Sequence, residues 1–159
     1  MKILIVYYSY EGDCAFIADK IKELRPDADV LRLATEDDKP RGFFAKYVWG
    51  GKQVLSGKKP ALKSYNIDIN EYEFVVIGTP VWAGSYTPAI ASFIADTKIE
   101  GKTIALFCCH AGGKGKTLEK LKSALTGNTF TDAVDFLEPK KHTAGVQEKL
   151  NWWVKSWQS

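Results

Sequence analysis

The chain has 159 residues with 22 basic and 19 acidic side chains, a net charge of +3, and 45% of its residues are hydrophobic. This composition is typical of globular proteins and excludes a disordered, collagen-like or multi-pass membrane chain. So small a net charge does not by itself indicate a nucleic-acid partner, and no apolar run approaches the ~18 residues that span a bilayer. We therefore predict a single domain over residues 1–159, with no nucleic-acid or membrane partner.

The first third of the chain alternates apolar runs with an amphipathic segment. Residues 3–8 form a continuous β-rich apolar run, which is typical of a strand buried on both faces of a parallel sheet. After a polar turn that carries a glycine, apolar residues recur at helical spacing from Cys14 to Leu24, and Pro26 ends this predicted helix. Residues 30–33 predict the second strand.

The long connection over residues 34–73 is interpreted as an elaboration of the fold. It contains a stretch of basic residues without an acidic one, and a predicted helix over residues 43–55 that the pair Gly50-Gly51 weakens. Aromatic residues among the lysines could bind single-stranded nucleic acid. Packing of the helix onto the core is the preferred interpretation, because apolar side chains fall on one helical face: Phe44, Val48 and Leu55.

The rest of the chain continues the alternation. Strands are predicted over residues 74–78, 103–108 and 134–137, and helices over residues 88–94, 118–125 and 146–157. Five strands that alternate with helices predict an α/β fold with a doubly wound parallel sheet.

The three cysteines, Cys14, Cys108 and Cys109, do not form the pattern of a disulfide framework. Cys108 and Cys109 could be a redox pair, but two thiols that end a buried strand is the preferred interpretation. The cysteine pattern fits a reducing compartment, and the N-terminal apolar run is too short for a signal peptide. The sequence therefore predicts a cytoplasmic protein.

Three irregular loops that carry glycines follow the first, third and fourth strands. Ligands of doubly wound sheets bind outside the carboxyl ends of the strands, so the loops should open at one edge. The first loop enters a helix N-terminus, whose free N–H groups can hold a phosphate; a tight turn with Asp13 as N-cap is an equally good interpretation. In the second loop, Trp82 could stack on a planar ligand or fold back onto the core. The third loop could bring N–H groups to a ring edge or form a flexible turn.

These segments together resemble the flavodoxin-like family over nearly the whole chain, with Gly-Thr-Pro-Val-Trp-Ala-Gly at residues 78–84 as the most specific motif. The resemblance implies the short form of a five-stranded sheet in the order 2-1-3-4-5, with an uninterrupted fifth strand, and non-covalently bound flavin mononucleotide (FMN). It also implies three sets of cofactor-binding residues. These are Ser9, Tyr10, Glu11, Gly12, Asp13 and Cys14 at the phosphate; Thr79, Pro80, Val81, Trp82, Ala83 and Gly84 beside the isoalloxazine ring; and Cys109, His110, Ala111, Gly112, Gly113 and Gly115 at its pyrimidine edge.

The first loop departs from the family pattern of Ser or Thr, any residue, Ser or Thr, Gly, Asn, Thr. Glu11, Asp13 and Cys14 replace hydroxyl and amide donors, and an ionised carboxylate cannot donate a hydrogen bond. Two functions therefore stay open. One is an FMN-dependent electron-transfer protein or oxidoreductase that works with a redox partner protein or NAD(P)H. The other is an interaction module that has lost its flavin.

The third loop allows one further alternative. Residues 110–117 nearly match the nucleotide-binding P-loop, but His110 replaces its first glycine and few residues follow for the rest of such a domain. In the flavin interpretation, this loop carries His110, Lys114 and Lys116 and no acidic residue, which favours the reduced flavin. The flavin would do the chemistry, so no catalytic side chain is predicted, and the histidines lack metal-ligand spacing.

Overall fold

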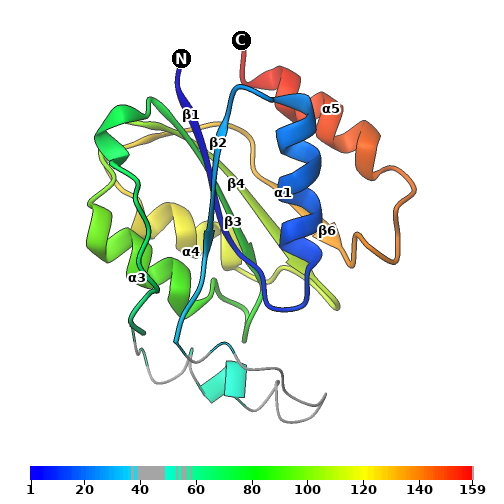
Figure 1. Ribbon diagram of the computed structural model, residues 1–159. Coiled ribbons are helices and arrows are strands. Elements are labelled where there is room, and N and C mark those ends of the chain that lie inside the picture. Colours follow the sequence, from blue (N-terminus) through cyan, green and yellow to red (C-terminus); the bar gives the residue numbers. More distant parts are fainter. Residues whose placement is uncertain (37, 39–48, 53, 55–56, 58, 159) are drawn as a thin grey trace.

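The computed structural model describes residues 1–36, 38, 49–52, 54, 57 and 59–158. Its centre is a parallel sheet in the order β2-β1-β3-β4-β5, with β6 also paired to β4 (Figure 1). The predicted order 2-1-3-4-5 is confirmed. The strands are β1 (Ile3–Tyr8), β2 (Asp29–Leu33), β3 (Phe74–Pro80), β4 (Thr103–His110), β5 (Thr129–Phe130) and β6 (Val134–Leu137).

The fifth position of the sheet corrects the sequence prediction. Instead of one uninterrupted strand, the short strands β5 and β6 both pair with β4, and residues 131–133 separate them. The Asp132 carbonyl leaves the ladder and accepts a 2.6 Å hydrogen bond from Trp153 Nε1. Because a helix side chain takes this carbonyl, regular pairing stops there and resumes at Val134.

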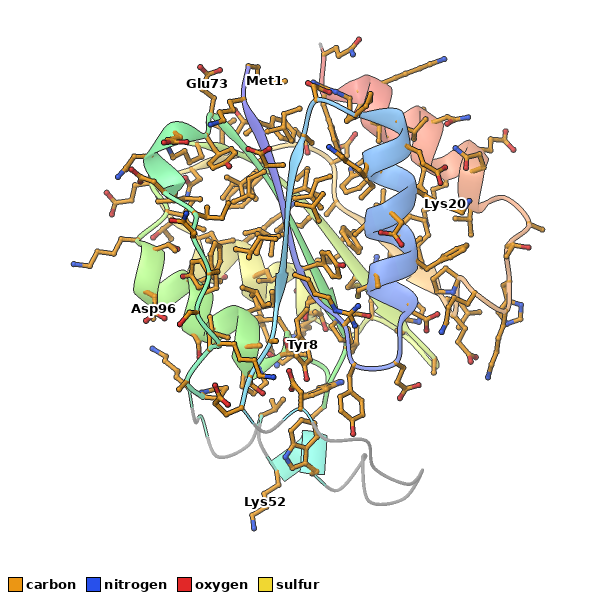
Figure 2. The ribbon with its side chains drawn as sticks, in the orientation of Figure 1. Met1, Tyr8, Lys20, Lys52, Glu73 and Asp96 are labelled. Atoms are coloured by element: carbon orange, nitrogen blue, oxygen red, sulfur yellow. The ribbon has the colours of Figure 1, made fainter. Side chains whose placement is uncertain are left out.

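Helices cover both faces of the sheet: α1 (Asp13–Leu24) and α5 (Val146–Ser156) on one, α3 (Pro88–Thr97) and α4 (Thr117–Ala124) on the other (Figure 1). A short 3₁₀ turn, η1 (Ile69–Glu71), precedes β3. Successive strand residues point to opposite faces, so the central strands β1, β3 and β4 supply both layers of the core. The buried side chains of the two layers fill the space between helices and sheet (Figure 2).

The same alternation decides the interpretation of the adjacent cysteines. Cys109 packs in the layer under α1 and α5, whereas Cys108 packs in the layer under α3 and α4. Both are buried and free. They therefore end a buried strand, as preferred, and point away from each other across the sheet.

Two strands extend further than predicted. β3 continues through Pro80 and β4 through His110, because Thr79 pairs with Cys108 and Pro80 with Cys109. Val81 N then donates to Cys109 O at 3.0 Å, so the pairing holds beyond the last residue of β3. The second and third loops consequently begin two residues later than the sequence indicated.

In the long connection, residues 49–52 and 54 are helical, which agrees with the C-terminal part of the predicted helix. The rest of that helix, and the predicted packing of Phe44, Val48 and Leu55, lie outside the described residues. Lys52 is exposed and extends away from the sheet (Figure 2), as expected for a solvated lysine. Among the described residues, no helix is both long enough and apolar enough to cross a membrane.

Gly78 is expected to be required for the packing of β3 against β4. A Cβ at this position would lie 2.1 Å from Cζ of Phe107, a fully buried ring on the neighbouring strand. We expect Gly78→Ala to lower the free energy of unfolding by ~1–3 kcal/mol through overpacking, measured by urea denaturation. Gly112→Ala is the matched control, because a Cβ there meets no atom within 4 Å. Equal stability of the two variants would contradict this role of Gly78.

Candidate functional site

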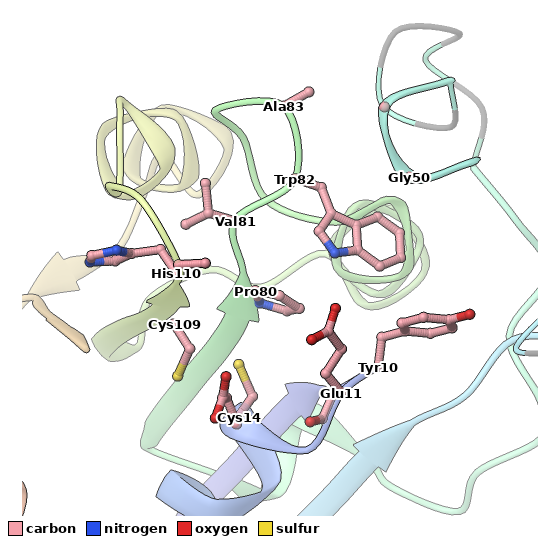
Figure 3. Close-up of a pocket in the computed structure, with 14 residues that line it drawn as sticks. Tyr10, Glu11, Cys14, Gly50, Pro80, Val81, Trp82, Ala83, Cys109 and His110 are labelled. Carbon is pink, nitrogen blue, oxygen red and sulfur yellow. The ribbon is translucent and has the colours of Figure 1, made fainter. Parts of the chain in front are cut away.

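A pocket of about 310 Å³ opens at the carboxyl ends of β1, β3 and β4 (Figure 3). Its volume lies at the lower end of the ~300–1,000 Å³ typical of small-molecule sites. The three predicted loops contribute most of its wall, and the long connection adds a fourth side. The lining residues are Ser9, Tyr10, Glu11, Asp13, Cys14, Gly50, Gly51, Pro80, Val81, Trp82, Ala83, Cys109, His110 and Ala111.

Ser9 shapes the first loop, which connects β1 to α1. Its Oγ accepts hydrogen bonds from the backbone N–H groups of Gly12 and Ala15, both at 3.2 Å. Arg32 on β2 donates from Nη2 to Ser9 O at 3.0 Å. The predicted phosphate-loop serine is thus buried and holds the loop around itself.

The N-terminus of α1 faces this pocket with unused donors. The N-cap is Gly12, in the left-handed region with φ 102°, so Asp13 is not the N-cap, and the first-turn N–H of Ala15 bonds to Ser9 Oγ. In the part of the chain that the structure describes, no acceptor pairs with the backbone N–H of Asp13 or of Cys14. Two N–H groups at the positive end of a helix are suited to an anion.

A tight turn sets the position of Trp82 in the second loop. Trp82 N donates to Ser85 O at 2.9 Å, and Ser85 N donates back to Trp82 O at 3.0 Å. The two residues between them, Ala83 and Gly84, have φ 49° and 69°, which corresponds to a turn of type I′. Ala83 is therefore held in a backbone conformation that residues other than glycine rarely adopt.

The Trp82 indole belongs both to the pocket wall and to a cluster of aromatic rings. Its centroid lies 5.0 Å from that of Trp49, 5.6 Å from that of Tyr8 and 6.0 Å from that of Tyr10. Gly50 follows Trp49, and a Cβ on it would lie 3.4 Å from Cδ2 of Trp82. The two interpretations from the sequence, ligand contact and packing against the protein, thus apply to the same side chain.

His110 and Lys114 of the third loop pair with an acidic residue of β6. His110 points away from Trp82 and Tyr10 (Figure 3), and its Nε2 lies 2.7 Å from Oδ2 of Asp135 on β6. Lys114 Nζ lies 3.6 Å from the other oxygen of the same carboxylate. The third loop contains no acidic residue, but Asp135 supplies one that is close in the structure. The sequence did not reveal this contact.

A sequence profile of the Flavodoxin family matches residues 2–156. The chain belongs to the flavodoxin family. Solved structures of flavodoxin-like proteins also resemble it. A flavoprotein from Lactobacillus acidophilus NCFM in complex with FMN is 23% identical, covers 89% of this chain and 97% of its own, and has a TM-score of 0.73. The two-electron reduced flavodoxin of Megasphaera elsdenii is 16% identical, with coverages of 96% and 97% and a TM-score of 0.62.

A protein from Bacteroides uniformis ATCC 8492 that has been assigned as a flavoprotein has a TM-score of 0.81, at 20% identity and with coverages of 97% of each chain. At these identities the likeness establishes the flavodoxin-like fold alone. A search of curated proteins found no match.

Some residues expected in the flavodoxin cofactor site do not line the pocket. Thr79 is fully buried, and its hydroxyl donates to Pro80 O at 2.8 Å and accepts from Thr87 N at 3.1 Å, so it holds the second loop in place. Gly84 lies against Gly115, where the second and third loops meet. The predicted residues outside the lining are Gly12, Thr79, Gly84, Gly112, Gly113 and Gly115.

Sequence reasoning missed Gly50 and Gly51 as lining residues. The two adjacent glycines could have indicated this, because a helix without side chains at these positions leaves space above Trp82. Periodicity alone could not show that this helix lies over the pocket, because the long connection carries it there.

Cys108 and Cys109 are buried thiols with raised pKa values. Figure 3 shows Cys14 and Cys109 side by side at the base of the pocket. A hydrogen bond with Cys14 together with burial raises the pKa of Cys109 far above its usual range. Burial likewise raises the pKa of Cys108 to about 12. Both groups stay as thiols at neutral pH and are poor nucleophiles.

The near match to a P-loop is not supported by the geometry. Lys116 is the N-cap of α4 and does not line the pocket, and Thr117 is fully buried, with its hydroxyl unpaired among the described residues. His110, at the position of the first P-loop glycine, belongs to β4. In this flavodoxin-family chain, the P-loop-like residues instead form the end of β4, the loop that follows it and the start of α4.

Asp135 should make the free energy of unfolding depend on pH in the acidic range. Burial alone would raise the pKa of Asp135, but the hydrogen bond with His110 and the charges of Lys149 and Lys114 outweigh it and lower the pKa. The carboxylate therefore stabilises the fold at neutral pH, and this contribution is lost as the pH falls through the lowered value. Because the side chain is 32% exposed, we expect a loss of only ~0.5–1 kcal/mol in Asp135→Asn at pH 7.

The measurement is chemical denaturation of both proteins at a series of pH values. The difference between parent and Asp135→Asn should begin to shrink below about pH 4, where the carboxyl group of the unfolded chain protonates, and should be lost as the pH falls through the lowered pKa of the folded state. A difference that stays constant from pH 7 to pH 3 would show that the lost contact is not electrostatic.

Proposed function

We propose that this protein binds FMN in the pocket and acts in electron transfer. One observation supports the proposal. The same cavity is lined by apolar side chains and by the N-terminus of α1, where two backbone N–H groups have no acceptor among the described residues. Pro80, Val81 and Trp82 form the apolar part, and the N–H groups of Asp13 and Cys14 face the same space. A flavin needs both environments, one for its planar ring and one for its phosphate.

The residues present fit the group. The family match and the FMN complex of the similar Lactobacillus flavoprotein support FMN as the cofactor. When bound, FMN accepts and releases electrons, and the protein supplies binding, orientation and electrostatics. Here the loop between β1 and α1 would hold the phosphate, and Trp82 with Pro80 and Val81 would exclude water from the ring. We also propose a cytoplasmic location and a single domain over residues 1–159.

Reconstitution with FMN tests the proposal. The purified protein is incubated with FMN, free ligand is removed by gel filtration, and the visible spectrum of the protein fraction is recorded. We expect a yellow protein and quenched flavin fluorescence. A colourless protein that does not quench added FMN would overturn the proposal.

The same preparation distinguishes a carrier from an oxidoreductase. Under anaerobic conditions, NADH or NADPH is mixed with the reconstituted protein and bleaching of the flavin is followed. A flavodoxin that carries electrons needs a reductase or another redox partner protein and stays oxidised. Rapid bleaching would indicate an FMN-dependent oxidoreductase that uses NAD(P)H directly.

The second candidate is an interaction module of the same fold without flavin. It is favoured by one observation, the acidic first loop. The Glu11 side chain points toward Pro80 and Trp82 at the mouth of the pocket (Figure 3), and Asp13 is the first residue of α1. Two carboxylates near the expected phosphate oppose its binding unless a cation offsets them. Failure of the reconstitution would favour this candidate.

A further inference from the structure

The loop between β6 and α5 lies against the first loop, near the N-terminus of α1 (Figure 1). Lys140 makes the contacts. Its Nζ donates to Glu11 O at 2.9 Å, and its backbone N lies 3.4 Å from Oδ1 of Asp13. A segment near the C-terminus of the chain thus brings an ammonium group to the expected phosphate site.

Gly12 allows this approach. A Cβ on Gly12 would lie 2.8 Å from Lys140 Nζ, so the ammonium lies directly over the backbone of the loop. Gly12 also has φ 102°, which disfavours any other residue. The ammonium therefore lies over the residue that precedes Asp13, next to the residues that line the pocket but not among them.

Lys140 contacts the first loop next to the N-terminus of α1, whereas Arg32 bonds to the loop at Ser9. Glu11 and Asp13 bring two carboxylates to the wall of the pocket. The neighbouring Lys141 forms an ion pair with Glu138 at 2.8 Å, within its own loop. Lys140 instead reaches the first loop. An ammonium has three N–H donors, and the described residues give Lys140 Nζ one acceptor, Glu11 O.

We propose that Lys140 binds the 5′-phosphate of FMN and makes the site selective for phosphorylated flavin over riboflavin. Its charge offsets Glu11 and Asp13, and its remaining N–H donors complete the cradle formed by Asp13 N and Cys14 N. This inference rests on the proposed function, because it assigns a residue to the same pocket. The competing explanation is that Lys140 only ties the two loops together.

The test compares two ligands that differ only in the phosphate. FMN and riboflavin are titrated into the parent, Lys140→Gln, Lys140→Arg and Lys141→Gln proteins, and the dissociation constants are read from fluorescence quenching at low and at high salt. A charged hydrogen bond near the surface is worth roughly a factor of ten. We expect Lys140→Gln to weaken FMN binding about tenfold and riboflavin binding less than about twofold. Lys140→Arg should bind FMN nearly as the parent does. Lys141→Gln removes a charge that also acts on Asp13 and Glu11 but no hydrogen bond to the first loop, so it should lose less affinity than Lys140→Gln.

Salt gives an independent readout. Added salt should weaken FMN binding less in Lys140→Gln than in the parent, because one screened ion pair has been removed. An equal loss for FMN and riboflavin would show that Lys140 only supports the loops and would overturn the inference, as would unchanged FMN binding. If the parent protein binds neither flavin, the proposed function fails and the inference fails with it; if it binds FMN, the variants decide the inference alone.

Discussion

Replacement of Trp153 by alanine is expected to lower the free energy of unfolding by about 3–5 kcal/mol. Trp153 on α5 is fully buried. Its ring lies edge-on to Phe107 of β4, 6.2 Å between centroids, and to Trp157, 5.0 Å between centroids. Its Nε1 also donates to Asp132 O at 2.6 Å. The variant therefore creates a cavity and leaves a carbonyl of the sheet edge without its partner.

The next residue is a matched control. Trp152 is on the same helix but 56% exposed, so Trp152→Ala should change stability by less than about 0.5 kcal/mol. Trp153→Phe keeps a ring and loses the hydrogen bond, and should fall between alanine and the parent. Urea denaturation followed by far-UV circular dichroism measures all three. Similar midpoints for Trp152→Ala and Trp153→Ala would contradict the structure of this layer.

Replacement of Trp82 by alanine is expected to weaken FMN binding by ~1–2 kcal/mol through lost apolar contact, about five- to thirtyfold in the dissociation constant. The reason is that the indole forms part of the pocket wall and is fixed there by the turn to Ser85. Riboflavin should lose the same factor, because it has the same ring system. The dissociation constants come from the quenching titration used for Lys140.

Trp82→Phe is the control for an aromatic surface and should retain most of the affinity. Since Trp82 also packs against Trp49 and Tyr8, the free energy of unfolding of each variant is measured alongside. Unchanged binding of both flavins in Trp82→Ala would mean that the indole serves only the aromatic cluster. A loss restricted to FMN would place the contact at the phosphate and exclude stacking.

The elements of the sheet could be predicted because their residues are buried on both faces. β1 is a run of six buried residues, and β3 and β4 are nearly as apolar. Such runs carry their signal locally, so their positions and the parallel order needed no tertiary information beyond the family resemblance. β5 could not be found in this way, because a strand of two residues is too short to show a periodic pattern.

The chemistry of the first loop shows the limit of local reasoning. The sequence shows that Glu11 and Asp13 replace hydrogen-bond donors of the family pattern. From that alone, the loop is expected to disfavour phosphate binding. The structure adds Lys140, whose contact with Glu11 joins positions 129 residues apart. No motif or spacing connects them, because the parallel topology alone brings the loops after β1 and β6 to one edge.

The sequence by itself determined the α/β alternation, the three loops and the aromatic residue at their centre. Buried strands, amphipathic helices and turns can be predicted from the types of residues that are adjacent in the chain. The tertiary structure decided which charges meet. Asp135 pairs with His110 and Lys114 of the third loop, Lys140 reaches the first loop, and Gly50 lies against Trp82. Charged residues that pair in the fold can be far apart in the sequence and produce no periodic pattern. The balance of charge at the pocket could therefore be determined only from the tertiary structure.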